Sequence, residues 1–198
     1  RDTDRSRGLG DVYKRQQLRR LIAAEMEGKP FCELAGVTFD HRGAAIVGHI
    51  LLDTLEENGY SIDDFDAVGA LTAAAVPLVG AMIQAAASRG EDLDGFVMDF
   101  VYPSIKGPSI KGKRVVLLDS WLSEKSYVQT SSLVTLRNGN ELSLDFGVVE
   151  HEGAKVVAIA SLIGGVDMTE PVIEVVNPVS GERQELPFVE IYHESELR

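Results

Sequence analysis

Residues 111–120 read Lys-Gly-Lys-Arg-Val-Val-Leu-Leu-Asp-Ser, a basic turn that leads into four apolar residues and then an acid. A short apolar run bounded by turn signals is typical of a strand buried on both faces, as in a parallel sheet. Open α/β sheets bind their ligands beyond the carboxyl ends of such strands. Asp119 is therefore a candidate for chemistry, although an acid that only caps a turn explains the pattern equally well.

A second candidate follows another apolar run. Residues 66–71 read Asp-Ala-Val-Gly-Ala-Leu, and Thr72 with residues 73–75, all alanine, comes directly after them. Small side chains let the backbone approach an anion, and Pro77 then opens a helix whose N-terminus favours negative charge. An alanine-rich turn before a helix also forms for packing alone, so both interpretations stay open.

The remaining nucleophile and metal-ligand types carry weaker signals. His41, His49, His151 and His193 are scattered without the spacing of a metal site, so no protein-built metal site is predicted. Cys32 is the lone cysteine, which excludes an internal disulfide and fits a reducing cytoplasm. We expect Cys32 to be a small buried residue rather than a nucleophile, because nothing near it in sequence looks like a base.

Strand and helix signals alternate along the chain, which predicts one α/β domain over residues 17–198 with a mainly parallel central sheet flanked by helices. Helices are predicted at residues 17–28, 40–59, 77–89 and 142–152. Strands are predicted at residues 66–71, 95–98, 114–119 and 155–163, with an extended segment at 31–38 and a loop at 99–112. Residues 127–136 read as an extra strand or hairpin arm, and residues 171–192 as a C-terminal β-hairpin that turns at 178–181.

Composition excludes several classes of function. The chain has 44% hydrophobic and 25% charged residues, as expected for a soluble globular protein, and has no run near the roughly 20 apolar residues of a membrane span. The formal charge is −12; residues 1–20 hold seven basic and three acidic side chains, which leaves −16 on the rest. So acidic a surface repels phosphate backbones, and binding to nucleic acid or membrane is not expected.

Residues 1–16 differ from the rest because they lack an initiator Met and show no apolar periodicity. Their second half resembles the translated adaptor sequence found at the ends of reading frames assembled from environmental DNA. We interpret this segment as a disordered assembly scar outside the domain. The alternative is a native, disordered basic tail.

Four segments in order resemble the orotate phosphoribosyltransferases, which have the type I phosphoribosyltransferase fold. They are VTFDHRGAAIVGHILL at residues 37–52, VGALTAAAVPL at 68–78, GKRVVLLD at 112–119 and LPFVEIYHESEL at 186–197. The resemblance implies transfer of a phosphoribosyl group from phosphoribosyl pyrophosphate (PRPP) to a pyrimidine base in nucleotide biosynthesis or salvage. It also implies Mg²⁺ carried by PRPP oxygens, a homodimer and a cytoplasmic location.

The resemblance also implies roles for particular residues. Asp119 would bind the ribose hydroxyls and act as the catalytic residue, with Ser120 at the position of the family's second acid. Lys29 would lie near the base, although a solvated turn lysine is the simpler interpretation. The loop for pyrophosphate would be Leu71, Thr72, Ala73 and Ala74, and the loop for the 5′-phosphate would be Arg137, Asn138, Gly139, Asn140 and Glu141.

The chain departs from the family's PRPP motif at three places. Only the first acid of the pair remains at Asp119-Ser120, and residues 121–126, Trp-Leu-Ser-Glu-Lys-Ser, replace a glycine-rich loop. After an insertion over residues 123–136, Glu141 brings negative charge to the phosphate position, although an acid also suits the first turn of a helix. The loop at 98–103 lacks the family's basic pair. A catalytically inactive member that binds a nucleotide-like ligand or a protein partner is therefore the alternative prediction.

Overall fold

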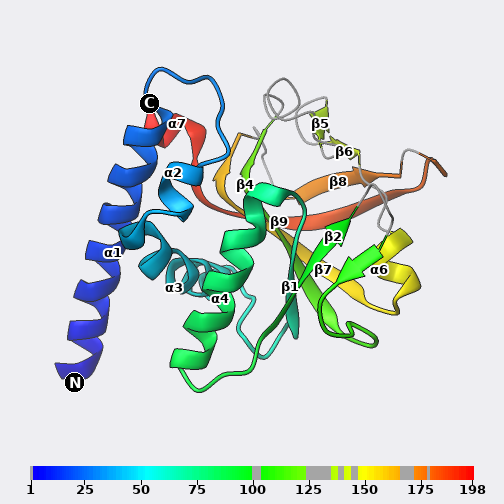
Figure 1. The fold of residues 1–198 in the computed structure, drawn as a ribbon, viewed down its shortest axis with the longest axis horizontal. Coiled ribbons are helices and arrows are strands. Elements are labelled where there is room, and N and C mark those ends of the chain that lie inside the picture. The colour runs from blue at the N-terminus through cyan, green and yellow to red at the C-terminus, as the bar shows by residue number, and fades with distance from the viewer. Residues whose placement is uncertain are drawn as a thin grey trace.

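The computed structural model describes residues 2–99, 104–123, 135–137, 141–143, 147–165, 172–177 and 179–198. Nine strands in these ranges form one mixed sheet in the order β3-β2-β1-β4-β7-β9-β8-β6-β5. The strands are β1 Ala67–Ala70, β2 Asp94–Asp99, β3 Ser104–Lys106, β4 Arg114–Leu122, β5 Thr135–Arg137, β6 Glu141–Ser143, β7 Lys155–Gly164, β8 Val172–Val176 and β9 Arg183–His193. The helices are α1 Asp2–Met26, α2 Ala35–Thr38, α3 His41–Glu57, α4 Val76–Ser88, α6 Gly147–His151 and α7 Glu194–Leu197 (Figure 1).

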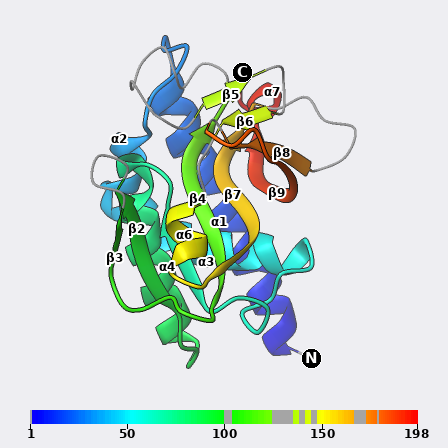
Figure 2. The same ribbon diagram turned by 90° about the vertical axis from the view of Figure 1, so that its right-hand side faces the viewer.

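The centre of the sheet is parallel, as predicted. Strands β2, β1, β4, β7 and β9 pair in parallel, whereas β3, β5 and β8 each pair antiparallel with a neighbour. Helices α1, α3 and α4 cover one face, and α6 packs on the other (Figure 2). Every residue of β1 is buried, as is every residue of β4 after Arg114, because helices cover one face of these strands and a second apolar cluster, which includes Val149 of α6, covers the other.

Helix α3 begins where the sequence predicted. The Asp40 side chain accepts a hydrogen bond from the backbone N–H of Arg42 and so caps the helix, and Gly59 beyond its end has a φ of 92°. Within the helix, a Cβ at Gly48 would lie 2.2 Å from the carbonyl oxygen of Ala81. Glycine at this position therefore permits the close packing of α3 on α4.

The C-terminal hairpin is confirmed. Strands β8 and β9 pair antiparallel, and the Asn177 side chain accepts hydrogen bonds from the backbone N–H groups of Val179 and Ser180 in the turn between them. An asparagine that bonds its own downstream backbone stabilises this kind of turn.

Strand β4 is longer than predicted. It continues for three residues beyond Asp119, to Leu122, because β7 extends alongside it and pairs Ile163 with Trp121. The β7 strand is paired in turn with β9 on its other side, which holds β7 in place beside the extension. The prediction that the strand ends at Asp119 is therefore wrong.

Three other predicted segments also differ. Residues 99–112 were predicted as a loop but contain β3, and residues 31–38 were predicted as extended but end in α2. The helix predicted at 142–152 begins only at Gly147, because residues 141–143 pair in parallel with β8 as strand β6. Pairing to a distant strand overrides local helix preference here. Most of the hairpin arm predicted at 127–136 lies outside the described residues.

The first helix also starts earlier than predicted. Helix α1 begins at Asp2 and continues through the segment for which the sequence predicted disorder. Near the end of that segment, Arg15 forms a 2.8 Å ion pair with Glu57, and its carbonyl oxygen accepts a 2.5 Å hydrogen bond from the hydroxyl of Tyr192. In the part of the chain that the structure describes, no helix is both long and apolar enough to cross a membrane.

We expect removal of residues 1–13 to leave the thermal midpoint unchanged, and removal of residues 1–16 to lower it by several degrees. The longer deletion removes the acceptor of the buried Tyr192 hydroxyl, a loss of about 1–3 kcal/mol. In a Tyr192→Phe background the two deletions should differ much less. Equal midpoints for the two deletions in the parent protein would contradict this account.

Candidate active site

The structure brings Asp119 and Thr72 together. Strands β1 and β4 pair in parallel up to Ala70 and Leu118, and the backbone N–H of Leu71 then donates a 2.9 Å hydrogen bond to the carbonyl of Leu118. This places Thr72 beside Asp119, and its hydroxyl donates to Asp119 Oδ1 at 2.9 Å. Thr72 and Asp119, which the sequence indicated separately, thus meet where the parallel pairing of β1 and β4 ends.

The Asp119 carboxyl group is buried and hydrogen-bonded. The residue is 4% exposed, and its Oδ1 also accepts a 2.8 Å hydrogen bond from the backbone N–H of Ser120. Burial raises the pKa of Asp119 to about 6, although the bonds from Thr72 and Ser120 oppose the rise; the negative charge of Glu33 adds to it. A carboxyl with such a pKa changes its charge near neutral pH, as functional carboxyls often do.

The remaining residues of the predicted pyrophosphate loop lead from Thr72 into α4. Leu71 is buried, whereas Ala73 is exposed and Ala74 is half-buried in a short 3₁₀ turn that spans Ala73–Ala75. Helix α4 follows immediately with Pro77 in its first turn. The loop therefore presents small residues and a helix N-terminus next to Asp119.

Ser120 lies in a different environment from that of a sugar-binding acid. It is 1% exposed, and among the described residues its hydroxyl oxygen has no hydrogen-bond partner. A carboxylate at this position would lack the solvent and donors that an ionised group requires. The serine therefore suits its surroundings better than the second acid of the family's motif would.

The sequence did not reveal the role of Trp121, which is fully buried in the extension of β4. Its ring lies 5.1 Å from that of Phe31, and its Nε1 donates a 2.5 Å hydrogen bond to Glu194 Oε1 at the start of α7. The Arg198 guanidinium lies 5.8 Å from the Trp121 ring and donates to the carbonyls of Lys29 and Pro30. The return of apolar residues after Asp119-Ser120 was the one available signal that the strand continues.

The predicted 5′-phosphate loop is not placed at the start of a helix. Arg137 in β5 and Glu141 in β6 are partner positions of two antiparallel strands at the far edge of the sheet, five and four strands away from β4 in sheet order. The interpretation of Glu141 as a residue of a helix's first turn is wrong, because it begins β6. Asn138, Gly139 and Asn140 lie outside the described residues.

Lys29 is exposed and lies in the turn that follows α1. Its ammonium lies 3.3 Å from Glu25 Oε1, one turn earlier on α1, and its carbonyl accepts from Arg198. These contacts agree with a solvated turn lysine, and its predicted role near the base remains a prediction.

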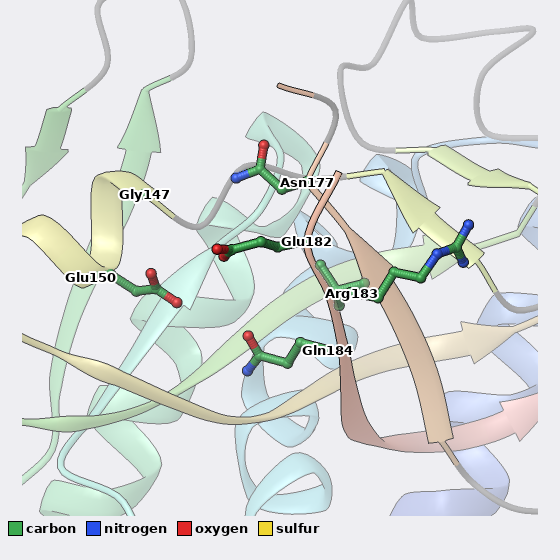
Figure 3. Close-up of a pocket in the computed structure, with 7 residues that line it drawn as sticks. Gly147, Glu150, Asn177, Glu182, Arg183 and Gln184 are labelled. Atoms are coloured by element: carbon green, nitrogen blue, oxygen red, sulfur yellow. The ribbon is translucent and has the colours of Figure 1, made fainter. Parts of the chain in front are cut away.

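A small polar pocket of about 80 Å³ lies between α6 and the β8–β9 hairpin. Figure 3 shows Glu150, Glu182 and Gln184 directed into it, with Arg183 directed away from it. Arg183 instead forms a 2.7 Å ion pair with Glu174. The two carboxylates make this pocket unfavourable for a phosphate group.

We expect the stability difference between the parent protein and Asp119→Asn to depend on pH. The pKa of Asp119 in the folded protein lies above its unfolded value of 3.8. The contribution of Asp119 to the free energy of unfolding is therefore fully present below about pH 4 and is lost as pH rises through about 6. Between about pH 4 and pH 8 the parent should lose about 3 kcal/mol of unfolding free energy relative to the variant. Glu190, whose pKa burial raises to about 7, titrates in both proteins and cancels. A difference that stays constant with pH would contradict this assignment.

We also expect opposite results from two substitutions at Ser120. Ser120→Ala should be neutral or slightly stabilising, because the buried hydroxyl has no partner to lose. Ser120→Asp should cost at least about 3 kcal/mol at pH 8, since it buries an unpaired charge. Urea unfolding of the three proteins measures both effects, and an aspartate variant as stable as the parent would show that the site is more open than its burial indicates.

Comparisons with known proteins agree with the resemblance in the sequence. Orotate phosphoribosyltransferases of Streptomyces avermitilis and Streptomyces coelicolor are each 31% identical to the chain over 148 residues, which cover 72% of the chain and 71% of the relative. No family model matches the chain.

Solved structures confirm the fold. A phosphoribosyltransferase from Corynebacterium diphtheriae superposes with a TM-score of 0.61 at 18% identity, covering 93% of the chain and 98% of that protein. The orotate phosphoribosyltransferase of Mycobacterium tuberculosis in complex with PRPP gives a TM-score of 0.57 at 17% identity, covering 95% of the chain and 91% of that protein. With the Streptomyces relatives, these likenesses show that the chain belongs to the orotate phosphoribosyltransferase family and has the type I phosphoribosyltransferase fold.

Proposed function

We propose that the protein transfers a phosphoribosyl group from PRPP to a pyrimidine base such as orotate. The observation that supports this most is the contact between Thr72 and Asp119 at the carboxyl ends of adjacent parallel strands, in a chain of this family. Ligands of such sheets bind at that edge. The relatives named above carry the same activity in their names, and one solved neighbour binds PRPP.

Asp119 would receive the sugar. An ionised carboxylate accepts hydrogen bonds from ribose hydroxyls and places negative charge near a sugar that becomes cationic in the transition state. Because its pKa lies at about 6, Asp119 is largely ionised above neutral pH and able to act in this way. Catalytic efficiency should therefore fall on acidification through about pH 6.

Mg²⁺ would accompany PRPP in this proposal. Among the described residues, no group of three or more His, Cys, Asp and Glu side chains could hold a metal ion, so PRPP oxygens would supply its ligands. The ion would neutralise charge on the departing pyrophosphate. The loop at residues 71–75 contains no Lys or Arg, Lys106 on β3 is paired with Asp99 at 3.0 Å, and the formal charge of the chain is −12. We therefore expect PRPP binding to be weak and sensitive to salt.

The proposal includes a homodimer acting in pyrimidine nucleotide formation in the cytoplasm, as the family resemblance implies. Sedimentation of the purified protein tests the assembly state. A protein that is monomeric at all concentrations would remove the dimer from the proposal without affecting the assignment of Asp119.

The burial of Trp121 favours a second candidate function. Strand β4 continues where the family's phosphate loop begins, and Trp121 is locked there by Phe31 and Glu194. A chain that has exchanged this loop for a packed strand fits a catalytically inactive protein that binds a nucleotide-like ligand or a protein partner. Calorimetry with PRPP and Mg²⁺, together with an assay for turnover of PRPP and orotate, separates the two functions.

We expect Asp119→Asn to lower kcat/KM for PRPP by at least about tenfold while the fold is retained, because a charge-assisted bond to the sugar is lost. Asp66→Asn is the matched control. Asp66 lies at the opposite end of the sheet, where it pairs with Arg114, so its loss should leave turnover unchanged.

The outcomes distinguish the candidates. Turnover that falls only in the Asp119 variant supports the transferase. PRPP binding without turnover supports the inactive ligand-binding protein. Turnover that is equal in the parent and Asp119→Asn would remove Asp119 from the proposed mechanism.

A further inference from the structure

The Thr72 hydroxyl does not make the capping hydrogen bond that is usual for a threonine at its position. It precedes the 3₁₀ turn Ala73–Ala75 with an extended backbone, as a cap residue does, but its side chain makes no capping hydrogen bond. A threonine at such a position usually accepts a bond from a backbone N–H of the following turn. Here the hydroxyl instead donates to Asp119 Oδ1 across the β1–β4 boundary.

This bond uses the only hydrogen of the hydroxyl. A threonine side chain has one O–H donor and two acceptor lone pairs. With its proton directed to Asp119, the Thr72 oxygen presents acceptor lone pairs to anything that approaches the loop, and these repel phosphate oxygens. The sequence suggested Thr72 as a pyrophosphate ligand, but its side chain lacks the free donor that this role requires.

We infer that Thr72 is a positioning residue that fixes Oδ1 of Asp119, leaving the other carboxylate oxygen for a sugar hydroxyl, and that any anion at this loop is bound by backbone N–H groups alone. The inference rests on the proposed function only in assigning the sugar to Asp119. The geometry that carries it is the pair of bonds on one oxygen, from the Thr72 hydroxyl at 2.9 Å and from the Ser120 N–H at 2.8 Å.

The positioning role of Thr72 can be measured through the pKa of Asp119. Burial and the carboxylate of Glu33, which precedes α2, raise the pKa of Asp119, whereas the bonds from Thr72 and Ser120 lower it. The bond from Ser120 comes from its backbone N–H, which a change of the Ser120 side chain leaves in place. Thr72 is therefore the side chain whose loss should shift the charge state of Asp119.

The experiment is a titration of the Asp119 carboxyl carbon by NMR in the parent protein, Thr72→Ser and Thr72→Val, with Asp119→Asn used to assign the signal. We expect the parent and the serine variant to titrate near the same pH, at about 6. The valine variant keeps the shape of threonine but lacks the donor, so its Asp119 should titrate at least about one pKa unit higher, a tenfold change in acid dissociation.

Thr54→Val provides the matched control. Thr54 is a buried threonine whose hydroxyl donates to the carbonyl of Ile50 within α3, so its loss should leave the Asp119 titration unchanged. An unchanged Asp119 pKa in Thr72→Val, or an equal shift in Thr54→Val, would overturn the inference. Circular dichroism confirms that each variant is folded before titration.

Failure of the proposed function can be distinguished from failure of the inference about Thr72. If the parent protein shows no turnover of PRPP with orotate, the transferase proposal falls, but the titration still decides the role of Thr72. If the protein is active, the acidic limb of its pH profile should move upward in Thr72→Val and stay in place in Thr72→Ser.

Discussion

The structure around the candidate site depends on the burial of one carboxylate in the middle of β4. A buried carboxylate is unfavourable unless hydrogen bonds compensate for the loss of water. Here the compensation requires the exact alignment of two strands, because the Leu71 N–H must bond the Leu118 carbonyl for the Thr72 hydroxyl to reach Asp119. The bond between Thr72 and Asp119 therefore depends on the parallel register of β1 and β4 and on the 3₁₀ turn that begins after Thr72.

A second constraint comes from the extension of β4. Trp121 joins three parts of the chain that are distant in sequence: the segment after α1 through Phe31, the sheet through its pairing with Ile163, and α7 through Glu194. Figure 1 shows α7 against the end of α1, where Arg19 donates to the carbonyl of Glu196. The end of α1, the segment that follows it and α7 are thus held together beside the strand in which the family's PRPP motif would lie. This explains how the fold is kept although the motif has changed.

Much of the fold could be predicted from the sequence because its signals are local. Asp40 followed by an apolar helical stripe defined α3, and uninterrupted apolar runs defined β1, β4 and β7. Thr72 and Asp119 were both identified, since each follows such a run. Two of the failures share a cause: the end of β4 and the strand β6 are determined by pairing with β7 and β8, which no local pattern reveals. The bond between Thr72 and Asp119 likewise depends on register and could not be deduced from either segment alone.

The central claim is that Asp119, held by Thr72, is the residue that receives the sugar. A crystal structure of the protein with PRPP and Mg²⁺ tests it most directly. The account predicts a ribose hydroxyl within about 3 Å of the Asp119 oxygen that Thr72 does not bond, with the bond from Thr72 to Oδ1 preserved. A bound PRPP whose ribose lies away from Asp119, or whose pyrophosphate has drawn the Thr72 hydroxyl away from it, would contradict the account.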